Sequence, residues 1–233
     1  MPYIGNGGAV GAGNDLLDPG LHDDPILGDV PSGMSTRFRL GGVSKTANYG
    51  SCQLVEDSNN ATVSSEQATG YATSLKFTAQ AQIRYQAASC LYLGTGDFSI
   101  KGKTWIDSSS TRILLWGWYV SSATPSATAD YLRIQRESNG TINAYINGVS
   151  RISFAGANNA WVEWEFRRIG NTLTGYKDGV SQGTFDVTGY NFTGSTNPST
   201  PSGTQGIWGM GFITSEGNTQ EWYCAALRIA MAV

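Results

Sequence analysis

Residues 131–154 read YLRIQRESNGTINAYINGVSRISF, and this stretch decides the fold class. Polar and apolar side chains alternate along Tyr131–Arg136 and along Thr141–Ile146, which is the period of a half-buried β-strand. The pairs Asn139-Gly140 and Asn147-Gly148 stand after these two runs. Such pairs tolerate φ > 0 at both central residues of a type I′ turn, so the stretch predicts consecutive antiparallel hairpins.

The same pattern of short apolar runs and turn residues extends in both directions from this stretch. Upstream, Ile113–Val120 is nearly continuously apolar, which is typical of a central strand covered on both faces. Downstream, Asp178-Gly179 marks a further hairpin turn, and we find no convincing helical period anywhere. We therefore predict an all-β protein built as an antiparallel two-sheet sandwich. The other expected strands are Thr36–Leu40, Leu75–Phe77, Phe98–Ile106, Val149–Phe154, Trp161–Ile169, Leu173–Tyr176, Val180–Val187, Ile207–Phe212 and Trp222–Met231.

Composition excludes several classes of function. The net charge of −3 leaves no basic surface for nucleic acid or an anionic membrane, and no apolar run is long enough to span a bilayer. The first residues do not form a secretion signal, so the 3 cysteines are expected to be reduced. A disulfide between Cys90 and Cys224 is the alternative.

Residues 1–35 differ from the rest of the chain in composition and in hydrophobic pattern. They are rich in glycine, proline and aspartate and show no strand or helix period, yet they contain many large aliphatic side chains. We interpret them as an irregular, extended docking arm that binds either the body of its own chain or a neighbour. Residues 36–233 form the predicted sandwich, although the stretch 36–74 could also belong to the arm. The arm residues expected to contact a partner are Tyr3, Ile4, Leu16, Leu17, Leu21, Ile26 and Leu27.

Residues 75–233 resemble the laminin-G-like domains of the concanavalin A-like jelly-roll class. The similarity rests on segments that occur in the family's order, and it implies two packed antiparallel sheets. These segments are Gly94–Ile100 followed by Trp105, Trp161–Arg168, Asn171–Val180 and Trp222–Ile229.

The opening Met1-Pro2-Tyr3-Ile4-Gly5 resembles the start of virion proteins of tailed bacteriophages. This resemblance implies a structural protein located in the virion, and a capsid decoration (cement) protein is the first hypothesis. Its arm would bind the major capsid protein or another virion protein, and its copies would form a homotrimer. The alternative is a carbohydrate-binding module of a tail or fibre, which recognises a glycan on the host surface.

Catalytic chemistry has few candidates in this sequence. The single histidine, His22, lies in the arm, and the dispersed cysteines do not form a zinc site. Glu163 and Glu165 share one strand face at a spacing that a glycan hydrolase could use. A solvated strand face with Glu–Arg pairs explains them without catalysis, because Val162, Trp164 and Phe166 form the opposite, apolar face, and Arg167 continues the charged one. We therefore expect no enzymatic activity and no cofactor.

Two further kinds of site, for a metal ion and for a sugar, have candidate residues in the sequence. Some laminin-G-like relatives hold a calcium ion at the rim, but Asp178 is explained as the turn residue before Gly179, and we expect no metal. Sugar binding by aromatic stacking would fall to Trp208 and Trp222, for which burial in the core is the alternative. Trp116, Trp118, Trp161 and Trp164 are predicted to belong to the core.

Overall fold

A computed structural model describes residues 27–41, 53–57, 61–65, 68, 74–78, 82–86, 93–107, 112–118, 130–192, 207–212 and 221–233. At residues 39–41, 53–57, 61, 63, 82–86, 118 and 207–212 the backbone alone is described. Within these ranges the chain forms strands and turns, and none of the described segments is a helix that could cross a membrane. The strands are β1 Met34–Gly41, β2 Gln53–Asp57, β3 Ala61–Ser64, β4 Ser74–Thr78, β5 Gln82–Gln86, β6 Phe98–Ile106, β7 Ile113–Trp118, β8 Leu132–Arg136, β9 Thr141–Ile146, β10 Val149–Ala155, β11 Ala160–Ile169, β12 Thr172–Lys177, β13 Val180–Asp186, β14 Ile207–Phe212 and β15 Glu221–Ala232.

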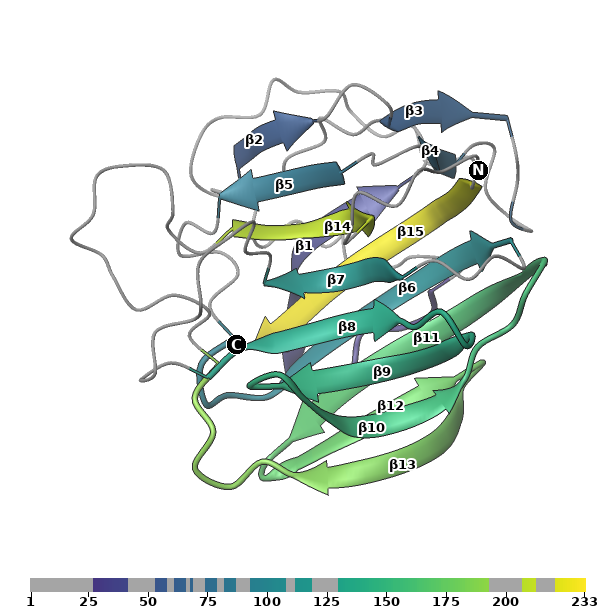
Figure 1. Cartoon of the computed structure of the whole chain (residues 1–233). Helices are drawn as coiled ribbons and strands as arrows, with labels where there is room; N and C mark the ends of the chain where they lie inside the picture. The colour runs from purple at the N-terminus through teal and green to yellow at the C-terminus, as the bar shows by residue number, and fades with distance from the viewer. Residues whose placement is uncertain are drawn as a thin grey trace, which may run out of the picture.

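These strands build two antiparallel sheets that pack face to face, as Figure 1 shows. The seven-stranded sheet has the order β10-β9-β8-β7-β14-β5-β2, and the eight-stranded sheet has the order β13-β12-β11-β6-β15-β4-β3. Strand β1 also pairs with β15. Since β6 follows β15 along one edge, β1 and β4 must lie end to end along its other edge. The predicted two-sheet antiparallel sandwich is confirmed.

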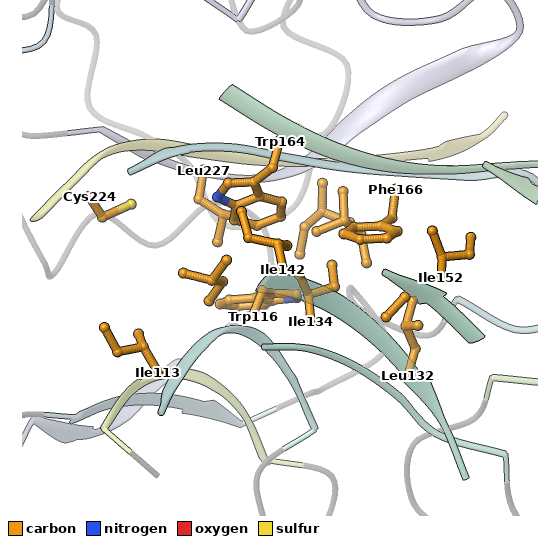
Figure 2. Packing of buried hydrophobic residues seen from close by; sticks show 14 of the residues in the cluster. Ile113, Trp116, Leu132, Ile134, Ile142, Ile152, Trp164, Phe166, Cys224 and Leu227 are labelled. Atoms are coloured by element: carbon orange, nitrogen blue, oxygen red, sulfur yellow. The ribbon is translucent and has the colours of Figure 1, made fainter. Parts of the chain in front are cut away.

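Large apolar side chains from both sheets fill the space between them (Figure 2). Trp116 comes from β7 of one sheet, and Trp164 and Phe166 come from β11 of the other. All three are fully buried, and the indole Nε1 of Trp164 donates to Thr104 Oγ1 at 3.2 Å. Phe38 of β1 packs against Trp116 with a centroid distance of 5.1 Å. The first strand is thus an integral part of the core.

The hairpin turns confirm part of the turn prediction and correct one detail. Asn147 and Asp178 have φ of 51° and 48°, and the glycine after each has φ of 78°, as type I′ turns require. At Asn139-Gly140 only the glycine has positive φ, and its N–H donates to the carbonyl of Glu137. A longer turn with a left-handed glycine at its end therefore joins β8 to β9.

The sandwich also includes residues before the segment that resembles laminin-G-like domains. Strands β2 and β5 extend the seven-stranded sheet, and β3 pairs with β4 at the edge of the other. Because β1 begins at Met34, the predicted boundary between arm and sandwich at residues 35 and 36 falls inside a strand.

Candidate functional site

Aromatic side chains lie side by side on the outer face of the eight-stranded sheet. Trp161 of β11 pairs in register with Trp105 of β6, and Trp105 pairs with Tyr223 of β15. Their chain neighbours Val162 and Cys224 are buried in the core. Because side chains alternate along a strand, Trp161, Trp105 and Tyr223 point away from the core. These three residues are called the aromatic row.

Two rings of the aromatic row are in contact, and none of the three is fully covered. The rings of Trp105 and Tyr223 meet edge to face, with centroids 5.4 Å apart and an interplanar angle of 73°. Trp105 and Trp161 are partly exposed, whereas Tyr223 is 8% exposed. Neighbouring strands lie about 4.8 Å apart, so adjacent rings of the row can contact a single flat ligand. The row offers apolar ring surface at the edge of solvent.

Charged side chains continue the row on its β4 side. Lys76 pairs in register with Tyr223, and its Nζ lies 5.7 Å from the centre of the Tyr223 ring. Glu221 accepts from Lys76 Nζ at 2.5 Å and from the Tyr223 hydroxyl at 2.7 Å. These hydrogen bonds lower the pKa of Glu221, and the bond to Glu221 raises the pKa of Lys76. Burial, followed by the bond to Glu221, raises the pKa of Tyr223. The arrangement fixes the tyrosine ring and places hydrogen-bonding groups beside it.

The two glutamates weighed as catalytic groups lie on the same outer face and hold ion pairs. Glu165 is 4% exposed, and it accepts from Arg167 at 2.7 and 2.9 Å and from the hydroxyl of Ser99 at 2.7 Å. Glu163 pairs with Lys101 at 2.7 Å. The predicted Glu–Arg partnership is confirmed for Glu165 and Arg167. Each carboxylate is thus engaged by a neighbouring cation on its own sheet.

A segment of the predicted arm covers another part of this face. The guanidinium of Arg228 donates to the carbonyl of Gly28 at 2.5 Å and to that of Asp29 at 3.1 Å. Arg228 is 1% exposed and Leu27 is fully buried. Leu27, predicted to contact a partner, therefore packs on its own chain. Arg228 holds the backbone that follows it. The other predicted arm residues, Tyr3, Ile4, Leu16, Leu17, Leu21 and Ile26, lie outside the described residues.

The tryptophans singled out in the sequence fall into different places. Trp222 is fully buried and stacks on Phe77 with a centroid distance of 4.1 Å, so it presents no ring face to a glycan. The core alternative therefore holds for Trp222. The prediction that Trp161 belongs to the core is wrong, because Trp161 shares the outer face with Glu163 and is partly exposed. The side chain of Trp208 lies outside the described residues, although β14 places its backbone opposite Trp118.

Metal-ligating and nucleophilic groups form no cluster in the part of the chain that the structure describes. Among the described residues, no group of three or more His, Cys, Asp or Glu side chains could hold a metal ion. Asp178 occupies the turn position expected for it, and its carboxylate accepts from the backbone N–H of Glu163 at 3.1 Å. Cys224 is a free thiol, and burial raises its pKa to about 12. His22 lies outside the described residues.

The chain is similar to known proteins in fold and not in sequence. No protein-family model matches it, and no curated protein matches it in sequence. Similar solved structures include the binding domain of botulinum neurotoxin serotype G, at 9% identity over 84% of this chain and 47% of that chain, with a TM-score of 0.60. The serotype D ligand-binding domain in complex with N-acetylneuraminic acid matches at 11% identity over 78% and 42% of the two chains, with a TM-score of 0.54.

A bacteriophage protein is similar over its whole length. This is a conserved carbohydrate esterase from the Shiga toxin-encoding bacteriophage phi24B, at 15% identity over 86% of this chain and 100% of that chain, with a TM-score of 0.53. The present chain spans less than half of the two neurotoxin chains. At these identities the likeness shows a shared β-sandwich fold.

Proposed function

We propose that this protein is a non-enzymatic carbohydrate-binding sandwich that recognises a glycan at the aromatic row. The observation that carries the proposal is the register of Trp161, Trp105 and Tyr223 across three neighbouring strands. A sugar ring has an apolar face of C–H groups and an edge of hydroxyl groups. Aromatic rings accept the former, and the Lys76–Glu221 pair beside them offers hydrogen bonds to the latter.

The similar structures support binding as the kind of function. Two of them are the binding domains of neurotoxins, one of these in complex with N-acetylneuraminic acid, and the third is a phage carbohydrate esterase. The proposal that the chain is not an enzyme rests on its own residues. Glu163 and Glu165 are engaged in ion pairs, and a general acid needs a carboxyl group free to reach its substrate.

The phage neighbour and the N-terminal resemblance together favour a phage particle as the place of action, with the protein in a tail or fibre. Capsid decoration is the second candidate, in which the first residues bind the major capsid protein and three copies assemble. The observation that supports it is that Arg228 binds the backbone carbonyls of Gly28 and Asp29 and so anchors this segment to the eight-stranded sheet. Leu27 itself serves the fold and not the partner.

Binding of the whole chain to a glycan array tests the first candidate. The glycans that bind are then titrated by calorimetry into Trp105→Ala and Trp161→Ala. Each variant is expected to weaken binding about tenfold or more, since a loss of 1.4 kcal/mol of contact energy is enough for that. Tyr176→Ala is the matched control, because Tyr176 lies on the same outer face under Arg167, away from the row, and it should leave affinity unchanged.

Three results would overturn parts of this proposal. If no glycan binds the wild-type chain, carbohydrate recognition is wrong. If the two tryptophan variants bind as well as wild type while keeping their melting temperature, the aromatic row is not the site. Localisation of the protein on the head of the intact particle, in contact with the major capsid protein, would favour decoration over a tail or fibre.

A further inference from the structure

The outer face of the seven-stranded sheet carries a cluster of polar side chains on β8, β9 and the turn after β8. Arg133 pairs in register with Tyr145, and Gln135 pairs with Asn143. The neighbours Ile134 and Ala144 belong to the core, so these four side chains point away from it. Beyond them, the backbone N–H of Glu137 donates to the carbonyl of Thr141. Arg133, Gln135, Glu137, Thr141, Asn143 and Tyr145 together are called the polar face.

Hydrogen bonds connect most of the polar face. Glu137 accepts from the Gln135 amide at 2.6 Å and from the Tyr145 hydroxyl, and Arg112 approaches its other oxygen at 3.5 Å. The amide nitrogen of Asn143 donates to Thr141 Oγ1 at 3.3 Å and to the Tyr145 hydroxyl at 3.5 Å. The glutamate is therefore well satisfied, whereas the donors of Asn143 make long bonds.

Three polar atoms of this cluster are left over. Gln135 Oε1, Asn143 Oδ1 and Arg133 Nε are buried, and among the described residues they have no hydrogen-bond partner. Gln135 is 3% exposed and Asn143 is 5% exposed. Buried polar atoms without partners destabilise a fold, so native structures keep few of them, and those that remain call for a functional or solvent partner.

Tyr145 explains how two of these atoms come to be covered. Its backbone lies in the row of Arg133, yet its hydroxyl reaches Glu137, two residues beyond Gln135 on the neighbouring strand. The side chain therefore passes over the Gln135–Asn143 pair. The guanidinium of Arg133 lies 4.9 Å from the ring of Tyr145 on the same face. Rotation of these two surface side chains is the motion that would open the pair to a ligand.

We propose that the polar face is a second binding site, for an uncharged sugar residue. Two neighbouring hydroxyl groups of the sugar donate to Gln135 Oε1 and Asn143 Oδ1, and an oxygen of the sugar accepts from Arg133 Nε. An ionised carboxylate cannot fill this role, since it has no proton to donate to two amide oxygens. A cationic ligand is opposed by Arg133 and Arg112. The inference rests on the proposed carbohydrate function for its ligand class, but it is independent of the aromatic row.

The unpartnered oxygens of Gln135 and Asn143 also predict that a substitution can weaken ligand binding without lowering the stability of the fold. Asn143→Leu removes an unpartnered acceptor and two long hydrogen bonds, and it keeps the approximate size of the side chain. A residue kept for the fold would lower the melting temperature when replaced. Replacing a residue that is kept for a ligand weakens ligand binding, while the melting temperature stays the same or rises.

The experiment is calorimetric titration of the full chain with methyl glycosides of neutral hexoses and with their singly deoxygenated analogues. It is carried out in the Trp105→Ala background, which weakens binding at the aromatic row. We expect Trp105→Ala to retain measurable sugar binding. The double variant Trp105→Ala/Asn143→Leu should bind at least tenfold more weakly than Trp105→Ala, and its melting temperature should not be lower. Ser153→Ala is the control. Ser153 lies on β10, pairs in register with Asn143 of β9, is exposed and takes no part in the hydrogen bonds of the polar face.

The outcomes separate this inference from the proposed function. If the wild-type chain binds glycans and Trp105→Ala abolishes all binding, the second site is wrong and the carbohydrate function stands. The same conclusion follows if Asn143→Leu leaves the affinity unchanged, or if it lowers the melting temperature by several degrees. If no glycan binds any form of the protein, both proposals fail.

Discussion

Substitution of Gly102 by alanine is expected to destabilise the sandwich, although glycine is ordinarily a weak residue in a strand. Gly102 lies in the middle of β6 and faces the core, where the indole of Trp164 covers it. A Cβ at this position would lie 2.4 Å from Cζ2 and 2.8 Å from Cε2 of that ring. Carbon atoms in contact are normally about 3.5–4.0 Å apart, so the ring or the strand has to move.

Two opposing contributions to the free energy of unfolding decide whether Gly102→Ala stabilises or destabilises the fold. Replacing a strand glycine with alanine stabilises by about 0.5–1 kcal/mol, because the unfolded chain loses less freedom on folding. Overpacking a core with one extra carbon destabilises by about 1–3 kcal/mol. Trp164 is fully buried, and displacement also threatens its hydrogen bond to Thr104, so the unfavourable effect wins. A net loss of about 1–2 kcal/mol lowers the melting temperature of a chain this size by about 2–8 °C.

Thermal unfolding of Gly102→Ala measures this loss directly. Gly96→Ala is the matched control, since a Cβ there meets nothing within 4 Å, and it should be neutral or slightly stabilising. In a Trp164→Leu background the smaller side chain leaves room, so Gly102→Ala should there cost much less than in wild type. A melting temperature of Gly102→Ala at or above that of wild type would refute the reasoning. An equal loss in the two backgrounds would show that Trp164 is not the cause.

The remaining predictions concern charge and reactivity. Glu165→Gln should lower the free energy of unfolding by about 1–3 kcal/mol in urea titrations, because it weakens the bonds from Arg167 and Ser99 to a buried carboxylate; an unchanged midpoint would contradict this. Hydrogen bonds from Lys76 and Tyr223 lower the pKa of Glu221 below its ordinary value of 4.5, so its contribution to stability is complete above that pH and is lost as the pH falls through the lowered value. Glu221→Gln should therefore be less acid-sensitive than wild type in melting temperatures taken between about pH 6 and pH 3. With the other two cysteines changed to serine, Cys224 should resist alkylation in the native protein and react after denaturation, because burial raises its pKa to about 12; rapid native labelling would show that the thiol is exposed.

The sequence was sufficient to predict the strands whose local signals are strong. The runs around Asn147-Gly148 and Asp178-Gly179 combine a clear period with turn residues of one preferred geometry, and both hairpins were located correctly. Strands β2, β3 and β5 are four or five residues long and lie in polar sequence. Tertiary pairing with neighbours holds them in place, so their own residues carry little signal.

The candidate site was harder to predict because it depends on register between strands. Nothing in the sequence aligns Trp161 with Trp105 and Tyr223, which lie far apart along the chain. One signal was nevertheless available for Trp161. Since Val162, Trp164 and Phe166 share the core face, strict alternation already places Trp161 on the opposite face beside Glu163. The burial of Leu27 could not be foreseen, because the residues that follow it bind Arg228, about 200 residues away along the chain.

The two proposed sites and residues 27–29 lie on defined faces of the sandwich, which constrains how a partner could bind. Arg228 pairs with Lys101 on β6, four residues from Trp105, so the segment held by Arg228 lies about 13 Å from the aromatic row on the same sheet face. A partner held against residues 27–29 would therefore lie on the sheet face that bears the aromatic row, whereas the polar face lies on the other sheet. If the proposals hold, a partner bound there leaves the polar face open to a sugar, and recognition at the aromatic row needs the eight-stranded sheet to face the glycan.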